Sequence, residues 1–420
     1  MINFCIIEDN DYKKLLPLTE TRPIYDVLVG SSTLFEKFKG YFSHGNITLH
    51  CRDYLKASVK ARHNDYNVNK INIGSPCLFF NGRVVLDEEL ANLINSIDEK
   101  SNSIITYQNH FVCAYVKGEL LSKMLQVLKT PPSSQDLIKL IRPKASAKEL
   151  DTVKIISNNW DVIHLNESVI VEDFNQKQQF GIIKAEMKPF VTIYNENNVF
   201  IDRGSKIDDF VVINAENGPV YIEDNVHIHA HSHLEGPLFI GRNTQILGGA
   251  IRRSSIGESC KIAGEVSCSI FHSFSNKAHS GFIGHSYIGQ WVNIGAGSTT
   301  SNLKNNYSPI KTTYFNTVQE TGQQFLGSII GDHVKLAIGT MLNSGCTIHF
   351  GSQVFDHDTW STKEYSAFSW GPKKEKVKPD AFFETVSKTM NRRQLELNPQ
   401  EKDLFQFLYE QYCHDHDQRV

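Results

Sequence analysis

Aliphatic side chains recur every six residues through the middle of the chain. The recurring positions are Ile201, Ile207 and Ile213; Ile222, Ile228, Leu234, Ile240 and Ile246; Ile256 and Ile262; Ile288 and Ile294; and Ile330, Leu336, Leu342, Ile348 and Val354. Glycine often follows the aliphatic residue, as in "IGRNTQ" and "IGQWVN". A helix requires spacings of three and four, and a lone strand requires a spacing of two. The period of six therefore predicts short strands that are joined by corners.

Stacked coils of such strands bury one continuous column of aliphatic side chains, which a single repeat cannot do. We therefore predict a parallel β-helix over residues 191–356. The repeat is interrupted at 247–255, 263–287 and 295–329. The last interruption is polar and too long for a corner, which predicts a functional loop or a subunit-contact arm.

The two ends of the chain do not repeat. Residues 1–190 alternate strand-like runs such as "NITLHC" with helix-like runs such as "STLFEKFKGYF", which predicts an α/β domain with a largely parallel sheet. Within it, "KTPPSSQD" and "RPKASAKE" are interpreted as connectors. Residues 357–420 end in "NPQEKDLFQFLYEQY", where Asn398 suits the N-cap and Pro399 the first helical position. This predicts a helical tail that packs on the β-helix or on a neighbouring subunit.

Composition narrows the class of protein. The chain has 420 residues, 40% of them hydrophobic and 21% charged, with a net charge of −3. The absence of a long basic run argues against nucleic-acid or membrane-surface binding. No segment approaches the roughly 20 apolar residues of a membrane span, and the N-terminus does not read as a signal peptide. Eight dispersed cysteines form no CxxC pair, so we expect neither a zinc ribbon nor disulfides, and a reduced, cytoplasmic compartment.

The segment "HIHAHSHLEG" raises the question of a metal site. Its alternating histidines are His227, His229, His231 and His233. An extended strand would place them on one face, where they could bind zinc. However, repeat corners at Ile228 and Leu234 would break a straight ladder, and no carboxylate or cysteine is obvious nearby. We therefore predict no metal site here.

The segment "AHSGFIGHSYIGQWVNIGAGSTTSN" resembles the acetyltransferase half of the bifunctional glucosamine-1-phosphate N-acetyltransferase / N-acetylglucosamine-1-phosphate uridylyltransferase family, whose β-helix is left-handed. Residues 292–297 match that family's "VNIGAG" in full. The resemblance implies a catalytic role for His279. It also implies substrate contacts at Asn293 and Asn302, and coenzyme A contacts at Ala296 and Gly297.

Two positions depart from the family pattern. Phe282 replaces a tyrosine, and Ser267 replaces a basic residue. Arg252 and Lys277, with Arg253 beside them, are the cations that we expect to bind a phosphate instead.

Direct acyl transfer from a thioester to an amine requires a base and a donor for the developing oxyanion. Histidine suits the base because its pKa lies near working pH. We therefore interpret His279 as the base. His285 has no counterpart in the family and is interpreted as a residue of the β-helix rim.

The N-terminal run "KKLLPLTETRPIYDVLVGSSTLFEKF" resembles the opening of sugar nucleotidylyltransferases. In that family a glycine-rich loop wraps the nucleotide phosphates, whereas the equivalent "EDNDYK" has no glycine. Arg83 stands where a metal-binding aspartate is expected, and an arginine can hold a phosphate but cannot ligate Mg²⁺. Arg22, Asn81 and Arg83 are the candidate nucleotide contacts, and Mg²⁺ and UTP are implied if this domain is active.

These observations predict a transferase that uses acetyl-CoA to acetylate an amino-sugar phosphate. One alternative is a sugar nucleotidylyltransferase with a structural β-helix. Another is a non-catalytic protein that binds a nucleotide sugar. Because the family's members are trimers, the resemblance also implies a homotrimer.

Overall fold

The structure is a computed structural model that describes residues 3–43, 45–71, 74–355, 361–371 and 375–414. It contains two compact units. The first comprises Met1–Val27, Ser32–Asn158 and Asn398–Phe407, and the second comprises Leu28–Ser31, Asn159–Leu397 and Leu408–Val420. The domain boundaries predicted after residues 190 and 356 stay predictions.

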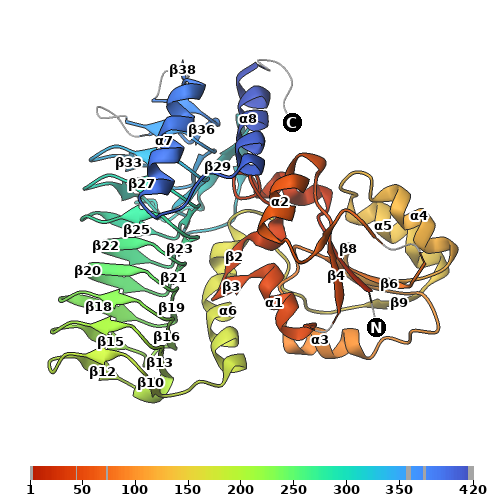
Figure 1. The fold of residues 1–420 in the computed structure, drawn as a ribbon, viewed down its shortest axis with the longest axis horizontal. Coiled ribbons are helices and arrows are strands. Elements are labelled where there is room, and N and C mark those ends of the chain that lie inside the picture. The colour runs from red at the N-terminus through yellow and green to blue at the C-terminus, as the bar shows by residue number, and fades with distance from the viewer. Residues whose placement is uncertain (1–2, 44, 72–73, 356–360, 372–374, 415–420) are drawn as a thin grey trace. The chain divides into compact units, whose positions relative to one another are not determined.

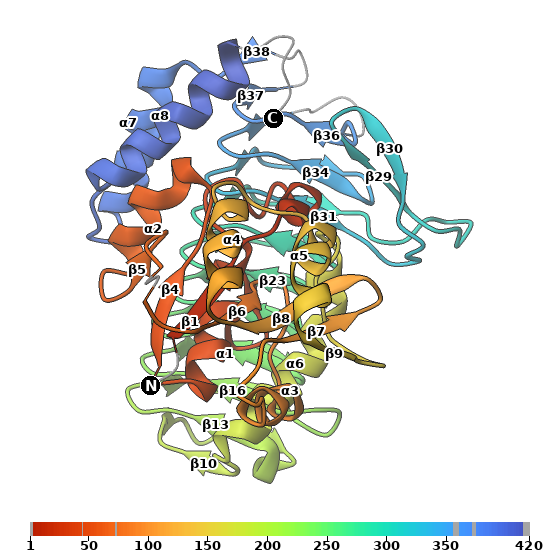
Figure 2. The same cartoon turned by 90° about the vertical axis from the view of Figure 1, so that its right-hand side faces the viewer.

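The first unit is built on one seven-stranded sheet (Figure 2). In spatial order its strands are β5 (Asn67–Val68), β4 (Asn46–Leu49), β1 (Asn3–Ile7), β6 (Cys77–Asn81), β8 (His110–Val116), β7 (Ser103–Tyr107) and β9 (Ser146–Glu149). Strands β5, β4, β1 and β6 run parallel, while β8 runs antiparallel to both β6 and β7. The predicted α/β architecture is confirmed, with β8 as the strand that reverses direction.

The helices of the first unit are α1 (Leu34–Tyr41), α2 (Lys56–Arg62), α3 (Glu88–Asn95), α4 (Glu119–Val127) and α5 (Ser134–Ile141). Among them, α1 forms where the helix-like run over residues 32–42 predicts it, whereas α2 and α5 were not predicted. A capping box between Thr33 and Glu36 begins α1, which satisfies backbone N–H groups of its first turn. The two predicted connectors are wrong in part. Ser133 caps α5 with Asp136, and the exposed β9 pairs with β7, because an edge strand needs no hydrophobic alternation.

The second unit is a parallel β-helix with three strand-bearing faces (Figure 1). Its first face consists of β10 (Ile182–Ile183), β13 (Val199–Ile201), β16 (Val220–Ile222), β19 (Leu238–Ile240), β21 (Ser255–Ile256), β23 (Ile270–Phe271), β26 (Tyr287–Ile288), β31 (Ser328–Ile330), β34 (Cys346–Ile348) and β36 (Glu364–Tyr365).

The second face consists of β11 (Glu186–Met187), β14 (Lys206–Ile207), β17 (His227–Ile228), the first parts of β20 (Gln245–Arg252) and β22 (Lys261–Ser267), β24 (Asn276–Lys277), β27 (Asn293–Ile294), β32 (Lys335–Leu336), β35 (Gln353–Val354), β37 (Ser369–Trp370) and β38 (Glu375–Lys376). The third face consists of β12 (Thr192–Tyr194), β15 (Val212–Asn214), β18 (Ser232–Glu235), the later parts of β20 and β22, β25 (Phe282–Gly284), β28 (Thr299–Thr300) and β33 (Met341–Leu342).

The six-residue period corresponds to the inward-facing positions of these coils. Every aliphatic residue of the repeat is at most 3% exposed, and together they form one continuous core. Parallel register joins equivalent positions of successive coils, so that Ile207, Ile228 and Ile246 stack in a column. The predicted β-helix is therefore confirmed, and its stability comes from apolar burial shared between neighbouring coils.

The long interruption at 295–329 leaves the β-helix after β28 and contains an antiparallel hairpin. The hairpin strands are β29 (Lys311–Tyr314) and β30 (Thr317–Glu320). The backbone N–H groups of Phe315 and Asn316 donate to the Glu364 carboxylate at 2.7 and 2.8 Å. The hairpin is thus attached to a later coil of its own β-helix.

One helix directly precedes the coils of the β-helix in the chain, and two helices follow them. Helix α6 (Asp161–Lys177) packs Ile170 and Phe174 on aromatic side chains of the first face. The short strand β2 (Leu28–Val29) pairs with β3 (Ser32–Thr33), and α7 (Pro379–Asn391) and α8 (Pro399–His414) follow the last coils. The predicted cap of α8 is confirmed, because Asn398 Oδ1 accepts from the Glu401 N–H at 2.8 Å. Within the described residues, every helix is too short or too polar to cross a membrane.

Candidate functional site

His279 lies at an exposed corner between the second and third faces of the β-helix. It follows β24 and precedes β25. The next coil runs directly alongside, since the Gly297 N–H donates to the Ser280 carbonyl at 3.0 Å. Gly281 allows this close approach. Its φ is +123°, and a Cβ there would lie 2.2 Å from the Ser298 carbonyl oxygen. The sequence motif therefore brings His279 beside the coil that carries Ala296 and Gly297.

Lys277 supports this corner from below. It is 1% exposed, and its Nζ donates to the carbonyl oxygens of Ala263 and His279 at 2.7 and 2.8 Å. Burial lowers the pKa of Lys277 to about 8. The side chain fixes the backbone of His279, and its role in substrate binding stays a prediction.

Asn293 borders a cavity between the second face and helix α7. The cavity has a volume of about 250 Å³. Its other walls are Phe274, Asn276, Trp291, Val292, Lys335, Thr385, Thr389, Arg392 and Arg393. Asn276 and Asn293 occupy equivalent positions of adjacent coils, and Lys335 takes the same position on the next. The cavity thus places two amide side chains below a lysine, with two arginines opposite.

Lys335 and Arg393 of this cavity donate to neutral hydrogen-bond acceptors. Lys335 Nζ donates to the Trp291 carbonyl at 2.6 Å, and Arg393 Nη2 donates to Asn276 Oδ1 at 2.7 Å. Burial lowers the pKa of Lys335 to about 8, so its ammonium is still the main form at neutral pH. Among the described residues, none of those lining the cavity carries a carboxylate, so the cavity suits an anionic group.

The sequence analysis missed Lys335, Arg392 and Arg393. Lys335 precedes a repeat aliphatic, as many outward-facing residues do. Arg393 lies 117 residues from Asn276 in the chain. Its approach depends on how α7 folds back on the coils, and the local pattern carries no signal for this.

Asn302 and Arg252 lie on the third face rather than beside Asn293. Asn302 Nδ2 lies 2.9 Å from His285 Nδ1, and the His285 ring stacks on Phe325. Burial, followed by the charges of His164 and Arg253, lowers the pKa of His285 to about 4. His285 is therefore a neutral partner of Asn302.

Arg252 is held between acidic side chains. Its guanidinium lies 2.9 Å from Glu265 and 3.6 Å from Glu235. The predicted substrate residues are thus divided between two faces. Lys277 and Asn293 belong to strands of the second face, whereas Arg252 ends β20 and Asn302 follows β28, which are strands of the third face.

In the first unit, Asn81 and Arg83 form an internal network at the end of β6. Arg83 is 0% exposed. Its guanidinium lies 2.7 Å from Asp9 and 3.0 Å from Asp11, and it also donates to the Ile156 carbonyl. Asn81 Nδ2 donates to Asp9 Oδ2 at 3.0 Å. This geometry gives no support to the predicted nucleotide contacts at Asn81 and Arg83, because the donors that would meet a phosphate are used internally.

A second buried ion pair lies beside the first. Arg52 Nε donates to Glu8 Oε2 at 3.0 Å, and its other nitrogens reach Tyr54 and the Arg22 carbonyl. Arg22 itself is 3% exposed. A larger cavity of about 780 Å³ lies elsewhere in this unit, between Asp87, Tyr107 and Lys154, and its lining includes none of the three predicted contacts.

The segment predicted in place of a glycine-rich loop folds as a short 3-10 helix, Asn10–Leu15. Asp9 caps this helix through the Asp11 N–H, and both carboxylates also accept from Arg83. Magnesium prefers carboxylate oxygens that no cation neutralises. Asp9 and Asp11 therefore do not fit a Mg²⁺ ion in this arrangement.

The chain is similar to one protein family and to several bifunctional proteins. A family model described as sugar nucleotidyl transferase matches residues 4–179. A bifunctional sugar-1-phosphate nucleotidylyltransferase/acetyltransferase from Sulfurisphaera tokodaii is 29% identical over 171 residues, which cover 38% of this chain and 40% of that protein. The bifunctional protein GlmU of Jannaschia sp. is 24% identical over 236 residues, 53% of this chain and 50% of that protein.

A longer match is the bifunctional protein GlmU of Wigglesworthia glossinidia brevipalpis. It is 22% identical over 303 residues, which cover 65% of this chain and 61% of that protein. The matches thus span about half the length of these relatives. The resemblance predicted from the sequence is confirmed: a region that matches the sugar nucleotidyl transferase model precedes a β-helix, and the chain is similar to bifunctional nucleotidylyltransferase/acetyltransferases.

Proposed function

We propose that the β-helix is an acyltransferase that uses acetyl-CoA to N-acetylate a phosphorylated amino sugar such as glucosamine-1-phosphate. One observation carries the proposal. The motif residue Asn293 borders a cavity that also holds Lys335 and Arg393, while the same motif's Ala296 and Gly297 run beside His279. Neighbouring coils thus carry an amide that can position the substrate, cations that can bind its phosphate, and a histidine that can act as the base.

The reaction follows from these groups. The substrate amine attacks the thioester carbonyl of acetyl-CoA, and His279 removes the amine proton as the C–N bond forms. The C–S bond then breaks, and the thiolate of coenzyme A leaves and takes up a proton. An amide donor such as the Asn293 side chain stabilises the oxyanion between these two steps.

His279 suits the base better than its neighbour His285. His279 is exposed at its corner, within reach of a substrate. His285 is half-buried beside Asn302, and its pKa of about 4 makes it a weak proton acceptor at neutral pH. His285 instead orients Asn302, in keeping with the rim position predicted for it.

We further propose that the complete site forms between copies of the chain. The predicted substrate residues lie on two faces of one β-helix. A neighbouring copy whose third face meets the second face of the first would bring Arg252 and Asn302 towards Asn293. Repetition of this heterologous contact closes a ring if the rotation between copies is a whole fraction of a turn. A homotrimer is the assembly that the resemblance implies.

A second candidate function is sugar-1-phosphate nucleotidyl transfer by the first unit, which the family match over residues 4–179 favours. The buried pairing of Arg83 with Asp9 opposes it. We therefore propose that this unit does not turn over UTP by the route that uses a glycine-rich loop and a Mg²⁺ site at β1 and β6.

Thiol release tests the acyl transfer. Purified chain would be given acetyl-CoA and glucosamine-1-phosphate, and free coenzyme A would be measured. We expect His279→Ala to lower kcat by about 10²- to 10⁴-fold, and the matched control His285→Ala to lower it far less. Equal losses in both variants would reject His279 as the base.

A parallel assay tests the first unit. It would follow pyrophosphate release from UTP, Mg²⁺ and N-acetylglucosamine-1-phosphate. We expect no release above background. Rapid release would show that the first unit is an active nucleotidylyltransferase despite its buried ion pairs.

A further inference from the structure

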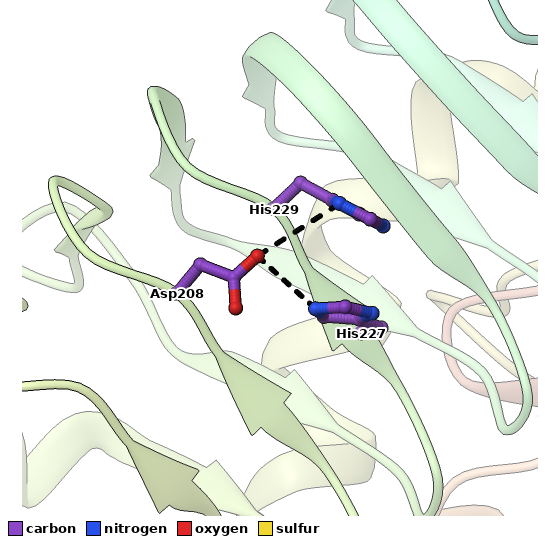
Figure 3. Close-up of side chains that lie close together, drawn as sticks. All are labelled: Asp208, His227 and His229. Atoms are coloured by element: carbon purple, nitrogen blue, oxygen red, sulfur yellow. Dashed lines mark hydrogen bonds and ion pairs between the residues drawn. The ribbon is translucent and has the colours of Figure 1, made fainter.

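Three metal-ligating side chains meet on the second face of the β-helix, away from the acyl-transfer residues. Asp208 follows β14, and His227 and His229 lie at and after β17. The parallel register sets Ile207 beside Ile228, which brings Asp208 next to His229. Residues two apart on a strand project from the same side, so His227 joins them. Figure 3 shows all three side chains pointing towards one another.

The distances within this cluster suit one shared ion. Asp208 Oδ2 lies 3.1 Å from His227 Nε2 and 3.8 Å from His229 Nδ1. One ligand atom from each residue lies within 4.8 Å of the other two. Zinc bonds to nitrogen and oxygen are about 2.0–2.1 Å long, so two ligands of a tetrahedral ion lie about 3.3 Å apart. The two distances to Asp208 lie on either side of that value. The two imidazole rings are stacked, with centroids 3.9 Å apart and an interplanar angle of 26°, so the rings must rotate to direct both nitrogens at one ion.

We propose that Asp208, His227 and His229 bind one divalent transition-metal ion of the zinc type, with water at a fourth position. Two imidazoles and one carboxylate form a donor set that zinc accepts readily, whereas Mg²⁺ and Ca²⁺ prefer oxygen ligands alone. Each of the three side chains is about one third exposed, at 34%, 34% and 37%. In the single chain, solvent therefore reaches the fourth position.

The fold explains why the histidine run alone does not predict this site. His231 lies at a corner, with φ of 63°, and stacks on Phe210. His233 belongs to β18 on the third face. The corners break the ladder, as the sequence analysis expects. The carboxylate that seemed to be missing is Asp208, which is 19 residues from His227 and reaches it because one coil stacks on the next.

An ion at this site would connect two coils of the β-helix through side chains. The competing explanation is an ordinary surface ion pair between Asp208 and His227, which needs no metal. The two explanations differ in whether the chain binds zinc in solution. The proposal does not depend on the proposed acyl transfer, because His279 and the cavity residues are not part of the cluster.

Zinc titration of the untagged full chain tests the proposal. The chain would be stripped with a chelator, dialysed and titrated with Zn²⁺ by calorimetry, with Mg²⁺ as the comparison ion. We expect one Zn²⁺ per chain with a Kd in the micromolar range or below, and no binding of Mg²⁺ at this site. Co²⁺ in place of Zn²⁺ should give the visible spectrum of a low-symmetry, nitrogen- and oxygen-ligated ion.

Variants assign the binding to these residues. Asp208→Asn and His229→Ala should each weaken Zn²⁺ binding by about 100-fold or more, since losing a direct ligand costs at least as much as losing an outer-shell partner. His233→Ala is the matched control, because it removes a histidine of the same run that faces elsewhere, and it should leave the Kd unchanged. Asp208→Asn preserves side-chain size, so it decides the question if His229→Ala fails to fold. Absence of Zn²⁺ binding, or unchanged binding in folded Asp208→Asn, would overturn the proposal.

Discussion

Two buried arginines of the first unit and two half-buried cations of the β-helix are held in opposite ways. In the first unit, Arg83 and Arg52 are paired with the carboxylates of Asp9 and Glu8. In the β-helix, the hydrogen bonds of Lys335 and Arg393 within the described part of the chain go to carbonyl or amide oxygens. A cation that is paired with a carboxylate inside the protein has a structural role. A cation that is hydrogen-bonded only to neutral groups retains an uncompensated positive charge, which can bind an anionic ligand. The difference supports the proposal that the chain binds an anionic substrate on the β-helix.

The largest expected effect is on the stability of the first unit. Arg83→Met would leave Asp9 buried without its counter-charge, which typically costs about 3–5 kcal/mol in the free energy of unfolding. Denaturant unfolding would measure it. The double variant Asp9→Asn/Arg83→Met removes both charges and should recover much of the loss. If Arg83→Met is as stable as the wild type but no longer binds a nucleotide, then Arg83 is a ligand contact. That result would contradict the difference drawn between the two units.

The next effect concerns ligand binding by the β-helix. Lys335→Met or Arg393→Met should raise the KM for the sugar phosphate by about 10- to 100-fold, because each removes a charge-assisted hydrogen bond of about 1.5–3 kcal/mol. Steady-state kinetics would show it. Lys261→Met is a matched control, since Lys261 faces outward on the same face and does not line the cavity. If all three variants behave alike, the cavity is not the phosphate site.

A third effect is on stability against pH in the β-helix. The pKa of His285 is about 4 in the folded chain, below its ordinary value of 6.5, chiefly because of burial. Its neutral form therefore favours folding fully above pH 6.5, and this contribution declines as the pH falls towards 4. We expect a loss of about 2 kcal/mol across that window after allowance for partial exposure. Unfolding curves of His285→Asn should have a flatter pH profile between pH 6.5 and 4, and an unchanged profile would contradict the assigned burial.

The smallest expected effect is a pH dependence of substrate affinity that arises from Lys335 in the cavity. Lys335 is cationic below its pKa of about 8 and neutral above it. Affinity for the phosphorylated substrate should therefore fall as the pH rises from 7 to 9, by about tenfold. Lys335→Arg, whose guanidinium stays charged, should remove this dependence. A wild-type KM that does not change over this range would show that Lys335 does not contact the anion.

The sequence predicts structure well where the same physical demand is repeated. Each coil must bury an aliphatic residue at an equivalent position, so the period of six identifies the β-helix without further information. Similarly, the cap formed by Asn398 and Glu401 is local, and its residues lie three apart in the chain. Such patterns are visible in the sequence because the interactions behind them join residues that are close together in the chain or that recur at a fixed spacing.

The candidate sites depend on contacts that no local pattern records. Arg83 lies 74 residues from Asp9, and Arg393 lies 117 residues from Asn276. The sequence predicts that Arg83 stands in place of a metal ligand, but it carries no signal that the guanidinium pairs with Asp9. The proximity of Asp208 to His229 likewise depends on the length of one coil. Residue type limits what such a site can bind, while the stacking of coils decides which residues meet.

One short segment bears on how this architecture could be divided. Residues 28–31 belong to the β-helix unit although they lie within the N-terminal part of the sequence. There the Gly30 N–H donates to Asn166, Ser31 donates to Asp173, and Ser255 donates to the Gly30 carbonyl. Gly30 has φ of +68°, and a Cβ would lie 2.5 Å from Asp173. A gene fragment that begins after this segment would lose the buried hydrogen bonds that residues 30 and 31 make with α6. The two units therefore cannot be expressed separately by dividing the sequence at one point.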